Sequence, residues 1–225
     1  MRRSFVRWCF LSMLVVVVAA AAANAGMIGK LYVKRTEVLL TDRAGVVCRD
    51  AADMYCERNY ECPPGRVAHA MLYNFREEKG RKQLSGIALV CADPNAFSNP
   101  EYVGPAGAGY TGEVINDYCP VGYMLAGAKF ATSDRHDMTG VRRVCRRYRP
   151  YEERIGPNLY GEGLDAMTAA CPEKHWVTGV KVSFERKTDG SGKVDDTMIN
   201  ARFYCSEVRH WLVEPTKEEL DKLYE

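Results

Sequence analysis

Apolar and polar residues alternate in three stretches of the chain, each of which follows a Cys-Pro pair. The equivalent, mostly apolar positions are Met71, Tyr73 and Phe75 in the first stretch, Ala128, Phe130 and Thr132 in the second, and Val180, Val182 and Phe184 in the third. More polar residues such as Asn74, Lys129 and Ser183 lie between them. Because successive side chains of a strand point to opposite faces, this period of two predicts β-strands with one buried face.

A second alternating strand completes each stretch and ends on a cysteine. The residues on the face of that cysteine are Ile87 and Leu89, Val141 and Arg143, and Ala201 and Phe203. The opening cysteines are Cys62, Cys119 and Cys171, and the closing ones are Cys91, Cys145 and Cys205, at offsets of 29, 26 and 34 residues. Self-similarity of this kind indicates repeated structural units. The sequence therefore predicts an all-β domain of three units, each closed by the disulfide Cys62–Cys91, Cys119–Cys145 or Cys171–Cys205.

Residues 1–25 have the features of a cleavable signal peptide. Three arginines precede an apolar run of about 14 residues from Phe10 to Ala23, and Ala23-Asn24-Ala25 resembles a cleavage site. The run is shorter than the ~18 residues expected of a membrane span. The eight cysteines that follow indicate disulfides in an oxidising compartment. We therefore expect a secreted protein, in which Cys48–Cys56 forms a fourth bridge by elimination.

The expected domain organisation has three further parts after residues 1–25. An N-terminal segment, 26–61, closes the domain and contributes a strand near 30–40 that helps to close the first unit. The three-repeat domain spans 62–208, with cores at 62–91, 119–145 and 171–205. The tail, 209–225, contains a short helix, because Thr216-Lys217-Glu218-Glu219 has a capping-box pattern.

Charge and composition exclude several classes of function. Three of the 31 basic residues and none of the 29 acidic ones fall in residues 1–25, which leaves 28 basic against 29 acidic residues. A nearly neutral domain does not bind nucleic acid through bulk electrostatic attraction. The sequence contains no C-x-x-C pair, no Gly-rich phosphate loop and only four scattered histidines, so we expect no metal and no cofactor.

The third unit resembles a repeat of the vitelline membrane outer layer protein family. The resemblance is carried by Cys171-Pro172, by Gly179-Val180-Lys181-Val182, and by Asp195-Asp196-Thr197 with Asn200 before Cys205. The second unit is similar through Cys119-Pro120-x-Gly122, Gly127, Asp137 and Gly140, and the first through Cys62-Pro63-x-Gly65. This resemblance implies a β-prism, in which three antiparallel Greek-key sheets surround a pseudo-threefold axis and share one core.

The chain departs from the family pattern before each Cys-Pro pair. The Trp-Gly-rich segments of the family are replaced by stretches such as Gly109-Tyr110-Thr111-Gly112 and Leu159-Tyr160-Gly161-Glu162. The resemblance therefore supports the fold more than it supports a shared ligand site.

A polar cluster in the third unit is the first candidate ligand site. It comprises Asp195, Asp196, Thr197 and Asn200, with Asp137 as the counterpart in the second unit. Two carboxylates that catalyse glycoside hydrolysis must face each other across the substrate, whereas adjacent residues of a strand or turn point apart. Sugar binding and a purely structural role in the turn both remain open, and no catalytic residue is predicted.

An arginine-rich strand is the second candidate. The segment from Arg142 to Arg149 contains five arginines, of which Arg142, Arg146 and Arg147 are candidates for binding a partner. Arg143 occupies the position of Leu89 and Phe203 in the other units. Because a buried arginine must be paired, we expect an acid beside Arg143, either Asp134 or Asp137.

These observations favour a secreted, non-enzymatic structural or carbohydrate-binding protein of an extracellular coat, matrix or cell surface. Its expected partner is an extracellular glycan or a matrix or surface protein. One alternative is a secreted protein-protein interaction module that uses the arginine-rich strand or the C-terminal helix. A second alternative is a glycan-active enzyme.

Overall fold

The computed structural model describes residues 30–42, 44–45, 54–78, 80–104, 113–132, 138–156, 160–161, 167–188 and 194–211, and the regular elements in these ranges are all β-strands. They are β1 (Lys30–Leu40), β2 (Ala44–Gly45), β3 (Met54–Glu61), β4 (Val67–Glu78), β5 (Arg81–Ala92), β6 (Glu101–Val103), β7 (Glu113–Tyr118), β8 (Tyr123–Thr132), β9 (Met138–Arg147), β10 (Glu152–Ile155), β11 (Tyr160–Gly161), β12 (Met167–Ala170), β13 (His175–Thr188) and β14 (Val194–Trp211). The all-β prediction is confirmed.

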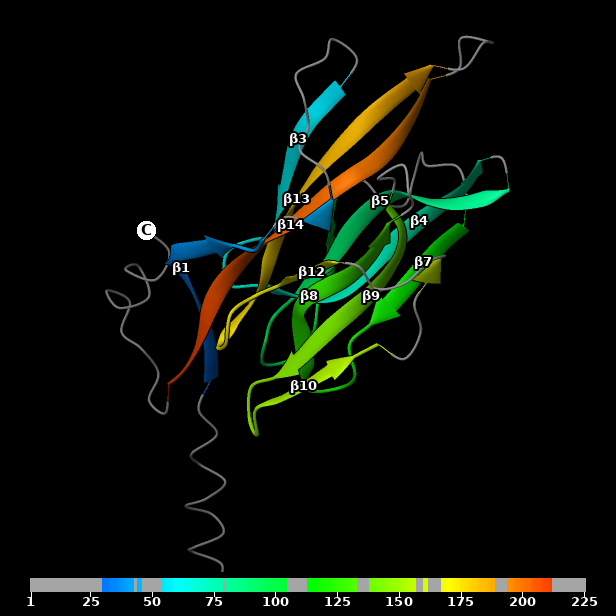
Figure 1. Cartoon of the computed structure of the whole chain (residues 1–225). Coiled ribbons are helices and arrows are strands. Elements are labelled where there is room, and N and C mark those ends of the chain that lie inside the picture. The colour runs from blue at the N-terminus through cyan, green and yellow to red at the C-terminus, as the bar shows by residue number, and fades with distance from the viewer. Residues whose placement is uncertain are drawn as a thin grey trace, which may run out of the picture.

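Three antiparallel sheets form the prism, and each has one of the predicted hairpins at its centre. The first sheet has the order β6-β5-β4-β7, the second β10-β9-β8-β12, and the third β1-β14-β13-β3, with the short strands β11 and β2 pairing to β9 and β14. Figure 1 shows the long β13–β14 hairpin extending past the other two hairpins, with β3 alongside β13. The architecture is the expected three-unit β-prism.

The three units exchange strands in a closed cycle. The strand before each Cys-Pro pair joins the sheet of the preceding unit: β7 pairs with β4, β12 with β8, and β3 with β13. At each junction the backbone N–H of the opening cysteine donates to a carbonyl of that sheet, with Cys119 bonded to His69 (2.9 Å), Cys171 to Ala126 (2.7 Å) and Cys62 to Thr178 (2.8 Å). Each acceptor is the extra residue of a β-bulge in its strand. The bulges therefore repeat with the units and connect them.

The N-terminal strand β1 pairs with the third unit. Val33 lies opposite Val208 in β14, whereas we expected this strand to help close the first unit. That expectation is wrong, because β6 already pairs with the outer edge of β5 and the 18-residue strand β14 offers a longer edge. It is β3 that joins the first unit to the third.

One hydrophobic core lies between the sheets. Residues at the predicted alternating positions, including Tyr73, Phe130 and Val182, are fully buried in one cluster to which all three sheets contribute. The first sheet also buries its opposite face, at Ala70, Leu72, Ala88 and Val90. One-sided burial is therefore wrong for the first unit, in which apolar residues occupy both faces.

Three disulfides close the three units as predicted. Cys62–Cys91, Cys119–Cys145 and Cys171–Cys205 have Cα–Cα distances of 5.6, 5.7 and 5.5 Å. The signal peptide, Cys48, the side chain of Cys56 and the helix expected after Thr216 lie outside the described residues. In the ranges that are described, no helix has the length and hydropathy to cross a membrane.

A second cluster closes one end of the prism. Val67, Met124 and Trp176 each lie five residues after an opening cysteine, and they pack together with Val33 and Val208. Leu31, Phe97 and Tyr148 pack against this cluster at its margin. The third unit thus places a tryptophan where the other units place a valine and a methionine.

Candidate ligand-binding groove

The polar cluster predicted in the third unit lies on the distal part of the β13–β14 hairpin. Asp195 and Asp196 lie opposite Lys187 and Arg186 in β13, and their side chains, like that of Thr197, are outside the described part of the chain, as is Asp137. The side chain of Asn200 is only 2% exposed. A buried amide contributes to packing rather than to contact with a dissolved ligand, which argues against Asn200 as a ligand-binding residue.

The arginine-rich strand does not form a continuous basic surface. Strand alternation places Arg142 and Arg146 on one face of β9 and Arg143 and Arg147 on the other. The guanidinium of Arg147 lies 5.5 Å from the centre of the Tyr123 ring. Arg146 is 5% exposed, which argues against its predicted role as a partner-binding residue.

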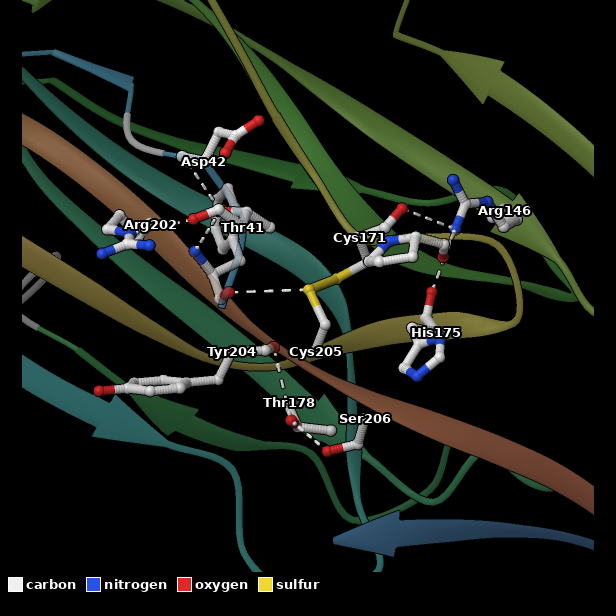
Figure 2. Close-up of a disulfide and its surroundings, with 12 residues drawn as sticks. Thr41, Asp42, Arg146, Cys171, His175, Thr178, Arg202, Tyr204, Cys205 and Ser206 are labelled. Carbon is white, nitrogen blue, oxygen red and sulfur yellow. Dashed lines mark hydrogen bonds between the residues drawn. A yellow bond between two sulfur atoms is a disulfide. The ribbon is translucent and has the colours of Figure 1, made fainter. Parts of the chain in front are cut away.

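Arg146 is buried because it binds the chain around the opening cysteine of the third unit. Its Nη1 donates to the carbonyl oxygens of Cys171 (3.1 Å), Pro172 (2.7 Å) and His175 (3.2 Å), and its Nη2 lies 2.8 Å from the Glu153 carboxylate. Figure 2 shows this guanidinium beside the Cys171–Cys205 disulfide. The residue that follows the closing cysteine is alanine or serine in the other units. This arginine therefore fixes the β12–β13 turn against β9 in one unit of the three.

A groove of about 450 Å³ lies beside this turn, where the second and third sheets meet. It is lined by Tyr148, Arg149 and Tyr151 after β9, by Glu173, Lys174 and Trp176 at the start of β13, and by residues 207–210 of β14. No motif in the sequence predicts that these residues form a site. Two departures of the third unit from the other units could have indicated the groove. Trp176 occupies the position of Val67 and Met124, and Lys174 replaces the glycine of the Cys-Pro-x-Gly pattern.

Aromatic rings form one wall of the groove. The Tyr148 ring lies 5.5 Å from the Trp176 ring and 6.1 Å from the His210 ring, and the latter pair is stacked. The indole N–H of Trp176, which is 1% exposed, donates to the Arg146 carbonyl at 3.2 Å. The guanidinium of Arg149 lies 5.5 Å from the centre of the Tyr148 ring. Burial and hydrogen bonding thus hold the wall in place before any ligand binds.

Charged and polar groups surround the aromatic wall. Tyr151 is 45% exposed, and burial of the remainder of its side chain raises the pKa of the phenol, so the hydroxyl stays protonated at neutral pH. Glu207 accepts two hydrogen bonds from Arg209, at 3.0 and 2.9 Å. Within the described ranges, no group of three or more His, Cys, Asp or Glu side chains could hold a metal ion. The groove therefore combines aromatic rings with charged and hydrogen-bonding groups.

Comparison with known proteins identifies the family of the chain. Among solved structures, the Calystegia sepium agglutinin has 9% identity to this chain and the Calsepa lectin in complex with a biantennary N-glycan has 8%. Both have a TM-score of 0.43, with coverage of 79% of this chain and 99% of theirs. PirB has 12% identity and a TM-score of 0.43, with coverage of 81% of this chain and 42% of its own. A comparison with curated protein sequences gave no match. The family model of vitelline membrane outer layer protein I matches residues 51–208, more than half of the 225 residues, so the chain belongs to this family.

Proposed function

We propose that this protein is a secreted, non-enzymatic carbohydrate-binding component of an extracellular coat, and that the groove binds the glycan. The partly exposed rings of Tyr148 and His210, supported by the buried Trp176, lie beside charged and polar groups, and this arrangement carries the proposal. A sugar ring has apolar C–H faces that pack on aromatic rings and hydroxyls that bond to polar groups around them. Family membership and the three disulfides support an extracellular location.

The preformed shape of the groove favours binding. Arg146 bonds to three carbonyls of the β12–β13 turn, and the Cys171–Cys205 disulfide joins that turn to β14. Because these connections already order both sides of the groove, a ligand that enters loses less free energy to ordering the protein.

The carboxylates of the groove favour binding over hydrolysis. Glu173 and Glu207 are the two acids that line it, and Glu207 is paired with Arg209. Glycoside hydrolysis requires two carboxyl groups that act on one bond, one as acid and one as base or nucleophile. Because the Glu207 carboxylate is already engaged by Arg209, we assign the two acids to ligand binding and not to catalysis.

The alternative of a protein-binding module has less support. It rested on the C-terminal helix, which lies outside the described residues, and on the arginine-rich strand, in which Arg143 and Arg146 are bound to acids of the same chain. Their guanidinium groups are thus already engaged within the fold.

A glycan array with the secreted protein tests the proposal. We expect a defined set of glycans to bind, and Tyr151→Ala and Tyr148→Ala to weaken their binding about tenfold, which corresponds to ~1.4 kcal/mol. The control is Tyr102→Ala, because Tyr102 is 57% exposed and belongs to the first sheet. An array without any bound glycan, or equal loss of binding in all three variants, would contradict the proposal.

A further inference from the structure

The third unit holds a lysine in a backbone conformation that favours glycine. The third residue after each opening cysteine has a positive φ: 77° at Gly65, 81° at Gly122 and 62° at Lys174. A β-carbon in this left-handed region lies too close to the neighbouring carbonyl oxygen, and glycine avoids that contact. This conformation occurs in all three units, and in two of them the residue is glycine. The side chain of Lys174 is thus retained despite an unfavourable backbone.

Packing does not account for this side chain. Lys174 is exposed, and among the residues that the structure describes its ammonium group has no hydrogen-bond or ion-pair partner. The contribution of Lys174 to the turn comes from its carbonyl oxygen, which accepts a hydrogen bond from the N–H of Val208 at 3.3 Å. Glycine would supply the same carbonyl. Strained residues that make no internal contact are concentrated at functional sites.

Lys174 lies in the groove, where its positive charge can interact with a bound ligand. It lines the groove together with Arg149 and Arg209 as cations, Glu173 and Glu207 as anions, and His210. Glu207 neutralises Arg209 through the bidentate contact described above. Arg149 is held against the Tyr148 ring of the aromatic wall. After the Glu207–Arg209 pair is set aside, the lining of the groove contains two positive charges, on Lys174 and Arg149, and one negative charge, on Glu173.

We propose that the groove binds an acidic saccharide, one that bears a carboxylate or a sulfate group, and that Lys174 binds this anion. The inference rests on the proposed glycan-binding function and specifies its ligand class. An ammonium group bonds to an anionic oxygen more strongly than to a neutral hydroxyl. The Tyr148 and His210 rings of the aromatic wall would contact the C–H face of the same sugar, and Arg149 would add a second positive charge at its edge.

Calorimetric titration of the full secreted protein with matched saccharides tests the inference. The carboxylate arm uses a hyaluronan hexasaccharide and its carboxyl-reduced form, and the sulfate arm uses a chondroitin sulfate hexasaccharide and its desulfated, carboxyl-reduced form. We expect at least one acidic member to bind about tenfold or more tightly than its neutral counterpart, with an affinity that falls as salt is added. A preference in both arms identifies the carboxylate, which chondroitin also carries, and a preference in the sulfate arm alone identifies the sulfate.

Two substitutions of Lys174 separate binding from folding. Lys174→Gln removes the charge, and Lys174→Gly installs the residue of the other units. We expect both to abolish the preference for the acidic saccharide, and Lys174→Gly to keep or raise the melting temperature. The matched control is Lys82→Gln, which removes an exposed lysine from β5 of the first sheet.

The outcomes distinguish this inference from the proposed function. Equal binding of acidic and neutral saccharides, or an unchanged preference in Lys174→Gln, would overturn the acidic-ligand inference and leave glycan binding intact. Failure of these saccharides and of every array glycan to bind would overturn both.

Discussion

The guanidinium of Arg143 in β9 forms an ion pair with the carboxylate of Asp117 in β7, and this pair joins the second sheet to the first. The two side chains are 12% and 4% exposed. The hydroxyl of Tyr73 donates to the same carboxylate at 2.6 Å. The expectation that Arg143 is paired is confirmed, but its partner is Asp117. We had expected Asp134 or Asp137, which lie outside the described residues.

Removal of the acid alone should destabilise the domain strongly. Asp117→Ala leaves the Arg143 charge buried without a partner, and we expect a loss of about 3 to 5 kcal/mol in the free energy of unfolding. Adding Arg143→Leu, which installs the leucine found at the equivalent position 89 of the first unit, should recover part of the lost stability, because no buried charge then remains. Urea denaturation of the single and double variants measures both values. A double variant no more stable than Asp117→Ala would show that the ion pair is not the source of the effect.

Substitution of Arg146 should affect both stability and ligand binding. Arg146→Lys keeps the positive charge but cannot reach Glu153 and the turn carbonyls simultaneously, since an ammonium lacks the guanidinium fork. We expect a loss of about 2 to 3 kcal/mol in stability and weaker glycan binding at temperatures where the variant is folded. The control is Arg81→Lys, an exposed residue of β5. Unchanged stability of Arg146→Lys would mean that these hydrogen bonds do not hold the turn.

Two glycines with positive φ should respond differently to alanine. A β-carbon at Gly127 would collide with the backbone of Ala169 and Ala170 in the neighbouring strand, whereas one at Gly80 would have no heavy atom within 4 Å. We therefore expect Gly80→Ala to cost about 1 to 2 kcal/mol through its backbone angle alone, and Gly127→Ala to cost clearly more. Thermal unfolding of the two variants compares them. Equal melting temperatures would indicate that β12 can move away from β8.

Stability should decline in mild acid because of His69. Its ring lies 5.7 Å from those of Phe97 and Tyr118, and burial lowers its pKa below the ordinary value of 6.5. Below about pH 6.5 the unfolded chain takes up a proton that the folded chain does not, so stability is lost from that pH down to the pKa of the folded state. Melting temperatures between about pH 7.5 and pH 5 measure the slope, which should be shallower in His69→Gln. The same slope in both proteins would assign the effect to other groups.

The sequence by itself determined the central hairpin of each unit. Alternation around Tyr73, Phe130 and Val182 predicted the strands, because burial of one strand face depends on the local order of residues. The spacing of cysteines predicted the three disulfides, since the two ends of a hairpin are close in space whatever surrounds it. The departure at Lys174 from the Cys-Pro-x-Gly pattern was also visible, although its meaning was not.

Only the tertiary structure decided which edges pair and which distant segments meet. β1 joined the third sheet, and Asp117 reached Arg143 because β7 pairs with the sheet of the preceding unit. The groove combines side chains near positions 148, 174 and 208, which no local pattern connects. These side chains come together because each unit contributes a strand to the sheet of another unit. Which sheet a strand joins depends on which sheet edges are not already hydrogen-bonded to other strands. A local period of two does not encode that choice, because it specifies the face of a strand and not its neighbour.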